Sequence, residues 1–422
     1  MNSSLQEMDL SRLLAGLRRI GADGGGVTRL VYDEAWCEAH AWLRTRGAEL
    51  GLEASTDSGG SILFHPPGLT PGTPAIFCGS HMDTVKQGGA YDGAYGAVAG
   101  MLLAAMHLGH EGLPVVGYVT AEEEGSRFFS PFIGARSLLG LADGADLDAI
   151  HDSEGVAWRA ALEFARSRGC AAPLAAGLKP FVPLFKPVME LELHIEQGPV
   201  LEAEQKEVGI VDTIAGFVRV DVRIRGDARH AGTTPMGMRR DALVAAAECI
   251  WSAEVLALEL GEPAVATVGR AEALPGAYNV VPGECRLRLD ARHSDPAVLT
   301  RMTAELEKRW RDIAHRRNIE LEWNVVARSE PVAMAPGMVA EAEALAGEMV
   351  FNWKKMPSGA GHDSMIFAGA GVPSLMIFVP SHRGVSHHPD EFTAPGELWE
   401  GVRFASALLE RLARSAANGG KA

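Results

Sequence analysis

PAIFCGSHMDTV, residues 74–85, is the stretch that decides the fold. It starts as a short apolar run and ends in two polar side chains, His81 and Asp83. Apolar residues at helical spacing follow over 94–108, and a second short apolar run covers 114–120. This order of strand, helix and strand predicts an α/β domain with a largely parallel sheet.

Chemically useful side chains follow both predicted strands. His81 and Asp83 come directly after the first, and the three acids of Glu122–Glu124 come after the second. Open α/β sheets bind ligands at the carboxyl ends of their strands. A histidine beside a carboxylate suits a metal ligand with its orienting partner. Three adjacent acids raise one another's pKa unless cations share the site, although a charged surface turn is the simpler alternative.

Further candidate ligands lie elsewhere in the chain. Asp92 precedes the predicted helix, where a plain helix cap is the alternative role. His194 lies in LHIEQG, and His387 and His388 lie in GVSHHP, each next to an apolar, strand-like run. A mixed set of imidazoles and carboxylates without cysteine describes a hydrolytic site with two metal ions.

The flanking segments extend the domain. Helical spacing over 9–20 and 33–50 predicts two helices, each opening with an aspartate able to cap it, Asp9 and Asp33. Near the other end, a helix over 339–349 and a buried strand over 374–378 return the chain to this first domain. The predicted catalytic domain therefore comprises residues 1–214 and 330–422.

The intervening segment, residues 215–329, has a different pattern. Apolar and charged residues alternate over 218–225, which indicates a strand with one wet face. The predicted elements that follow are a helix over 239–258, strands over 265–270 and 285–290, a helix over 296–316 and a strand over 319–325. The order βαββαβ predicts an inserted ferredoxin-like domain.

Composition restricts the class of protein. The net charge of -15 argues against a nucleic-acid partner. No apolar run is long enough for a membrane span, and the first residues show no secretory signal. Five scattered cysteines suit a reducing compartment. We therefore expect a cytoplasmic, soluble protein without a membrane partner.

Taken together, the motifs resemble the dinuclear metallopeptidase superfamily of carboxypeptidase, aminoacylase and succinyl-diaminopimelate desuccinylase type. Three further stretches are similar to its branch of carbamoylases and allantoate amidohydrolases. The resemblance runs from about His81 to the C-terminus. The superfamily motifs are 79–84, 92–93, 122–125 and 386–387, and the branch motifs are 121–128, 194–199 and 359–363.

The resemblance implies a role for each candidate ligand. His81 and His194 would bind one metal ion and Glu124 and His387 the other, while Asp92 would bridge both. His387 is preferred to His388 because the Gly-x-Ser-His pattern ends there. A histidine at 194, where peptidase relatives usually place a carboxylate, favours the ureido branch.

The resemblance also assigns catalytic and substrate-binding residues. Glu123 would be the base, Asp83 would orient His81, and His230 would stabilise the oxyanion. His362 is equally compatible with a structural role. The implied substrate-binding residues are Gln197 at the ureido end, His230, Asn279, Arg292 as a carboxylate clamp, and Gly361 through its backbone.

The implied activity is hydrolysis of the carbamoyl group of N-carbamoyl-L-amino acids with two divalent ions, Mn²⁺ or Zn²⁺, with Co²⁺ or Ni²⁺ as alternatives. Allantoate amidohydrolase and β-ureidopropionase are competing assignments. A metal-stabilised binding protein without catalysis is an alternative of another class. The resemblance further implies a homodimer through the inserted domain and hinge closure over the substrate.

Overall fold

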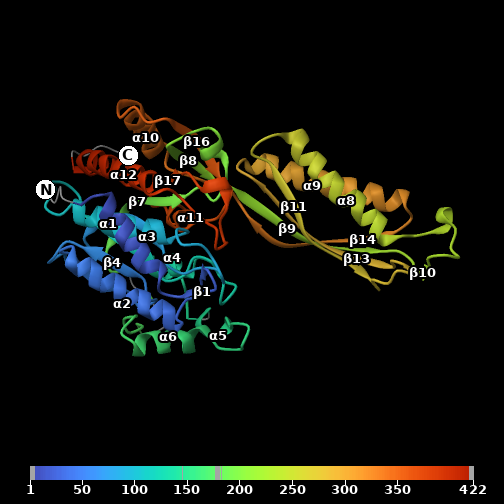
Figure 1. Cartoon of the computed structure of the whole chain (residues 1–422), viewed down its shortest axis with the longest axis horizontal. Coiled ribbons are helices and arrows are strands. Elements are labelled where there is room, and N and C mark those ends of the chain that lie inside the picture. Colours follow the sequence, from blue (N-terminus) through green and yellow to red (C-terminus); the bar gives the residue numbers. More distant parts are fainter. Residues whose placement is uncertain (1–4, 145, 176–180, 182, 418–422) are drawn as a thin grey trace. The chain divides into compact units, whose positions relative to one another are not determined.

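The computed structural model describes residues 5–144, 146–175, 181 and 183–417. The chain divides into two compact units. Unit 1 comprises Met1–Asp212, Ala333–Met356 and Gly361–Ala422. Unit 2 comprises Thr213–Val332 and Pro357–Ala360. Figure 1 shows both units, and each is described by itself below.

A mixed sheet forms the centre of unit 1, with strand order β15-β8-β17-β7-β5-β6-β4-β3, and β16 pairs with β8. The four strands β17, β7, β5 and β6 run parallel, whereas β8 at one side and β4 and β3 at the other are antiparallel. β5, β6 and β17 are buried along almost their whole length, as parallel strands covered on both faces must be. The predicted α/β class with a mainly parallel sheet is confirmed. The bounds are β3 (Glu53–Thr56), β4 (Ile62–His65), β5 (Pro74–His81), β6 (Val115–Thr120), β7 (Lys186–Ile195), β8 (Val208–Ile214) and β17 (Ser374–Val379).

Helices cover both faces of this sheet. Helix α3 packs on β5, β6 and β7, and α1 and α12 pack on α3, whereas α11 packs on β7 and β17. The long helices are α1 (Glu7–Arg18), α2 (Glu34–Glu49), α3 (Ala94–Met106), α6 (Trp158–Ser167), α10 (Pro336–Glu348) and α12 (Pro395–Ala417). The shorter elements are α4 (Ile133–Leu138), α5 (Asp146–Ala149), α7 (Val200–Ala203), α11 (Asp363–Gly369), η2 (His382–Gly384), β1 (Ala22–Asp23), β2 (Gly26–Val27), β15 (Val332–Ala333) and β16 (Trp353–Ser358).

The two predicted aspartate caps have different outcomes. Asp33 caps α2, because its side chain accepts a hydrogen bond from the Trp36 N–H at 2.6 Å. The prediction that Asp9 opens the first helix is wrong. The N-cap residue of α1 is Gln6, and Asp9 lies in the first turn, where its carboxylate accepts the Gln6 N–H at 3.0 Å. An acid in the first turn pairs with free N–H groups as a cap does, so the sequence alone does not separate the two positions.

Unit 2 has the predicted order βαββαβ. Its four strands form an antiparallel sheet of order β11-β13-β9-β14, and α8 and α9 lie side by side on one face (Figure 1). The alternating residues of β9 place Val218, Val220, Val222 and Ile224 in the core beneath these helices. The bounds are β9 (Gly216–Arg225), α8 (Ala242–Leu260), β11 (Val265–Leu274), β13 (Glu284–His293), α9 (Pro296–Arg316) and β14 (Glu320–Ser329). A small pair, β10 (Arg229–His230) with β12 (Val280–Val281), and the turn η1 (Met236–Met238) complete it.

Two properties bear on the setting of the protein. All five cysteines are free and buried. Within the ranges that the structure describes, no helix combines the length and apolar character needed to cross a membrane.

Gly100 tests the close packing of α3 on the sheet. A Cβ atom at this position would lie 2.3 Å from the Cys78 carbonyl oxygen, whereas one at Gly347, also helical, would meet nothing within 4 Å. Alanine is the better helix former by ~1 kcal/mol, so G347A should raise the midpoint of thermal unfolding slightly. G100A should lower it, because overpacking costs about 1–3 kcal/mol. Scanning calorimetry of both variants would contradict this packing if G100A unfolded at or above the wild-type temperature.

Candidate metal centre

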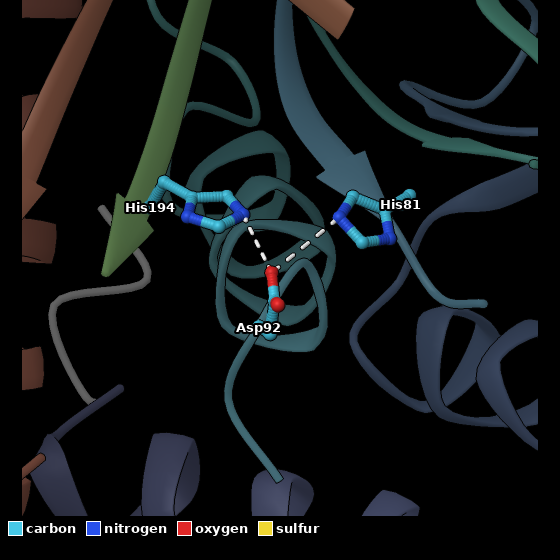
Figure 2. Close-up of side chains that lie close together, drawn as sticks. All are labelled: His81, Asp92 and His194. Atoms are coloured by element: carbon cyan, nitrogen blue, oxygen red, sulfur yellow. Dashed lines mark ion pairs between the residues drawn. The ribbon is translucent and has the colours of Figure 1, made fainter. Parts of the chain in front are cut away.

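Two groups of potential ligands meet at one edge of the unit 1 sheet. His81, Asp92 and His194 form the first, and Asp92, Glu124 and His387 form the second. In each group the ligand atoms lie within 4.8 Å of one another. His81 ends β5 and His194 lies near the end of the parallel neighbour β7, so both imidazoles emerge at the same edge. Figure 2 shows Asp92 between these two rings, just ahead of a helix.

The two oxygens of Asp92 face different groups. Oδ1 lies 3.2 Å from His194 Nε2 and 3.8 Å from His81 Nε2. Oδ2 lies 3.0 Å from His387 Nε2, which in turn is 3.5 Å from Glu124 Oε1. A carboxylate that presents one oxygen to each of two ligand groups has the arrangement of a bridge between two cations.

The protein orients both buried imidazoles through their other ring nitrogen. His81 Nδ1 lies 3.1 Å from the Asp83 carbonyl oxygen and 3.3 Å from Asp83 Oδ1. His194 Nδ1 lies 2.9 Å from the carbonyl oxygen of Ile195. Each acceptor holds a proton on Nδ1, so Nε2, which faces Asp92, is the ring nitrogen left to bind a metal ion. This is the tautomer that a metal ligand needs.

Asp83 also positions the acids that follow β6. Its Oδ1 accepts the Glu123 N–H at 3.1 Å, and its Oδ2 accepts the Glu124 N–H at 3.2 Å. Glu123 Oε2 lies 3.9 Å from His81 Nε2, so the predicted base is next to the first group. Glu122 belongs to neither group, and burial raises its pKa well above its usual range. Only two of the three consecutive acids therefore face the centre.

Charge is concentrated in this centre. Burial, followed by the neighbouring Asp92, raises the pKa of Glu124 to about 8, and burial likewise raises the pKa of Glu123. Burial also acts to raise the pKa of Asp92, but hydrogen bonds to His194 and His387 outweigh it and hold that pKa well below its usual range. The hydrogen bond to Asp92 raises the pKa of His387 to about 9. The residues present fit a pair of divalent cations, which would replace these protons and neutralise the acids.

The absence of a side chain at Gly93 leaves room for the imidazole ring of His81. The Gly93 φ of +63° lies in the left-handed region, and a Cβ atom there would lie 2.3–2.4 Å from three atoms of the His81 ring. Any side chain at this position would displace the imidazole. The pair Asp92-Gly93 therefore supplies a ligand and the space for another.

Other predicted residues of unit 1 lie around the centre. Gln197 has a φ of +60°, and its Nε2 donates to Asp92 Oδ2 at 3.0 Å. Its buried Oε1 has no hydrogen-bond partner among the described residues. The ring of His362 packs against that of His194, with centroids 4.6 Å apart, and burial lowers the pKa of His362.

Gly361 follows the boundary of unit 2, where a Cβ atom would lie 2.8 Å from Phe132 Cζ. His388 is exposed, and its Nδ1 accepts the N–H of Asp390 at 3.2 Å.

His230 and Asn279 lie together on unit 2. His230 is exposed, and its Nδ1 accepts the N–H groups of Gly232 at 3.1 Å and Thr233 at 3.2 Å. A neutral imidazole therefore carries its proton on Nε2, where it can be donated. The Asn279 carbonyl oxygen accepts the Ala231 N–H at 2.9 Å, which keeps these two predicted residues side by side.

Arg292 lies at the end of the four-stranded sheet of unit 2 that is opposite to the pair β10–β12. Its Nε and Nη2 donate to Asp290 at 2.7 and 3.2 Å, and its Nη1 donates to the Gly359 carbonyl oxygen at 2.7 Å. Three of its five N–H groups are thus used, and one remains on each Nη atom. Arg292 lies eight positions along β13 from Glu284, the end of this strand near β12. At ~3.4 Å per residue this amounts to roughly 27 Å.

Comparison with known proteins agrees with this fold. The model of peptidase family M20/M25/M40 matches residues 77–411, and the chain belongs to this family. Allantoate amidohydrolase of Escherichia coli is 38% identical over 96% of this chain and 97% of its own length. N-carbamoyl-L-amino-acid amidohydrolase of Paenarthrobacter aurescens is 35% identical over 97% and 100%. A crystal structure of an amidase of the hydantoinase/carbamoylase family from Burkholderia multivorans superimposes with a TM-score of 0.87 at 29% identity, covering 97% of this chain and 98% of that one.

Some residues at the centre have no signal in the sequence. Glu391 contacts the segments of Asp92 and His387, and Glu192 forms a further group with His194 and His362. Glu391 stands beside Asp390 in a loop, and Glu192 alternates with apolar residues as on a wet strand face, so only the folded contacts place them at the centre. Another group, His107, His110 and Glu410, lies away from the centre, and both ring nitrogens of His107 already face backbone carbonyl oxygens.

Binding of divalent ions should release protons. A raised histidine pKa means that the proton is held below that value, so His387, with a pKa of about 9, is protonated at pH 7 in the metal-free protein. An ion that binds its Nε2 must displace this proton, and affinity should rise from pH 7 toward pH 9. Titration calorimetry with Mn²⁺ at pH 7, in two buffers of different ionisation enthalpy, should give different heats. Equal heats would show that no proton leaves.

Proposed function

We propose that the protein hydrolyses the carbamoyl group of N-carbamoyl-L-amino acids at two divalent metal ions, releasing the amino acid, carbon dioxide and ammonia. One observation carries the proposal: buried Asp92 presents its two oxygens to two separate ligand groups, with Glu123 next to them. The relatives named above support the substrate class, because their names describe hydrolysis of ureido compounds.

Glu123 is the proposed general base. Its carboxyl is buried beside His81, and burial raises its pKa, so it accepts a proton more readily than an exposed carboxylate. It takes a proton from the attacking water and returns it to the leaving nitrogen. The bound ions, Mn²⁺ or Zn²⁺ in this proposal, would supply acidification of water and neutralisation of charge on the substrate oxygen. Asp83 contributes by holding the backbone of Glu123 and the ring of His81.

Side chains with free hydrogen-bonding capacity are proposed to bind the substrate. The buried Oε1 of Gln197 accepts from the ureido NH₂ group. The two remaining N–H groups of Arg292 hold the substrate carboxylate, while Asp290 keeps the guanidinium in place. His230 donates from Nε2 to the oxyanion, aided by Asn279, and Gly361 contributes backbone groups.

The positions of His230 and Arg292 support a dimeric site. The pair β10–β12 lies at one tip of unit 2 (Figure 1), at the end of the sheet opposite to Arg292. The strand rise puts roughly 27 Å between Glu284, at the β12 end of β13, and Arg292, which is far larger than an N-carbamoyl amino acid. His230 and Arg292 of the same chain therefore cannot contact the same substrate molecule. We propose that His230 acts on the substrate held by its partner in a homodimer.

Helix α8 offers a surface for this homodimer. Five of its large apolar side chains are exposed, with Trp251 at 67% and Leu258 at 74% of their full accessibility. The others are Leu243, Val244 and Leu260, and Val265 is exposed on the edge strand β11. Exposed apolar side chains gathered on one element mark an association surface.

The free cysteines further support a cytoplasmic enzyme.

Allantoate is the strongest competing substrate. The E. coli relative that acts on it has 38% identity with this chain, compared with 35% for the P. aurescens relative that acts on N-carbamoyl-L-amino acids. Both substrates present a ureido group near a carboxylate, so the residues described above suit either. The substrate of a β-ureidopropionase has the same two groups one carbon further apart and is the third candidate.

Ammonia release identifies the substrate. Manganese-loaded protein should release ammonia from N-carbamoyl-L-methionine faster than from allantoate or N-carbamoyl-β-alanine. E123Q is the matched control, because it removes the base and none of the five ligands. It should keep two ions per chain and lose at least ~10²-fold in kcat, the lower range for general base catalysis. Faster turnover of allantoate would replace the proposed substrate, and full activity of E123Q would refute the base.

Hybrid dimers test whether His230 acts on the partner. H230A and E123Q should each be nearly inactive alone. If His230 serves the partner's site, a co-expressed H230A and E123Q pair regains activity, because the hybrid has one site with both side chains intact. If His230 serves its own chain, every site lacks one group and activity stays at the level of the separate variants. Co-expression with two different affinity tags isolates the hybrid for this measurement.

A further inference from the structure

Glu391 belongs to the loop that carries His387 and is buried against the loop that carries Asp92. It follows His387 in SHHPDE and has 5% of its surface exposed. Its Oε1 accepts two backbone N–H groups, from Tyr91 at 2.7 Å and from Asp92 at 3.0 Å. Its Oε2 accepts the Ser386 hydroxyl at 2.9 Å. One carboxylate thus joins the backbone that bears Asp92 to the residue that precedes His387.

The second of these loops needs a partner to hold it. His387 has a φ of +56°, in the left-handed region that costs a non-glycine residue roughly 1–2 kcal/mol. Its side chain is 48% exposed, so packing fixes it less than the buried His81 and His194. The hydroxyl of Ser386 has a single proton, which it can give to Glu391 Oε2 at 2.9 Å or to Asp92 Oδ2 at 3.2 Å. The shorter contact favours Glu391 as the acceptor.

Gly89 keeps the space for this carboxylate. A Cβ atom at position 89 would lie 2.1 Å from Glu391 Cδ and from its Oε1. The φ of Gly89 is not in the left-handed region, so an alanine is compatible with the backbone. The substitution G89A therefore displaces the Glu391 carboxyl without altering its charge. It provides a test that is independent of changing Glu391 itself.

We propose that Glu391 is a positioning residue of the metal centre. It sets the distance between Asp92 Oδ2 and His387 Nε2, and so the affinity of the centre for the ion on the His387 side. The inference rests on the proposed two-metal function, although it concerns ion binding and not the substrate. Outer residues that orient metal ligands typically contribute 10–100-fold in affinity.

The test is titration calorimetry of the metal-free full-length protein with Mn²⁺. H387A identifies which of the two binding steps belongs to the His387 side. E391A and G89A should each weaken that step by about 10–100-fold and change the other step much less. The matched control is D57N, because Asp57 is likewise buried, at 3% exposed, and its Oδ1 accepts the backbone N–H groups of Gly59 and Ser61 at 2.9 and 2.7 Å. D57N should bind both ions as the wild type does.

The outcomes separate this inference from the proposed function. Wild-type affinity for both ions in E391A and G89A overturns the positioning role. An equal loss of affinity in D57N also overturns it, because that loss would report general destabilisation. Binding of fewer than two ions by the wild type overturns it as well. A third outcome separates the two claims. If the wild type binds two ions but hydrolyses no ureido acid, and E391A loses one binding step, the role of Glu391 is supported and the proposed substrate class is refuted.

Discussion

The buried charge of Asp92 and its neighbours is the main constraint on the architecture of this protein. The Asp92 carboxylate is buried within reach of three imidazoles, while Glu123 and Glu124 lie close by. Without cations, this centre binds protons to offset its charge. Divalent ions would offset the same charge. The ligand arrangement suits two of them, because each Asp92 oxygen already faces a separate group of donors. The remaining architecture serves to hold these groups at the required separations.

The parallel sheet supplies most of that positioning. β5 and β7 are adjacent and parallel, so His81 and His194 emerge at one edge, and the loop after β6 brings Glu123 and Glu124 to the same place. Asp83 connects two of these loops through its bonds to the His81 ring and to the backbone of both acids. The sheet fixes the strands, and the buried carboxylates fix the loops between them.

Much of this could be predicted from the sequence. Strands β5, β6 and β17 are short apolar runs, and candidate ligands stand at the end of β5 or just after β6, so these patterns together predict the positions of His81 and Glu124. The alternation over 218–225 similarly identifies the second sheet, because one face is wet. These features depend on local patterns, which a sequence displays.

Other features depend on contacts between distant residues and could not be predicted. Glu391 accepts a hydrogen bond from the backbone N–H of Asp92, 299 positions away, and an acid in the loop sequence PDEF carries no periodic signal for such a contact. The separation of His230 from Arg292 follows from strand pairing, which the residue types alone do not give. Asp9 was misplaced for a local reason, since an acid suits the cap and the first turn alike.

The most direct test is anomalous diffraction from crystals of the manganese-loaded protein, recorded near the manganese absorption edge. The account predicts two peaks, one coordinated by His81, His194 and Asp92 and the other by Asp92, Glu124 and His387, about 3.5–4 Å apart as in other two-metal sites. A single peak, or peaks that do not share Asp92, would contradict it.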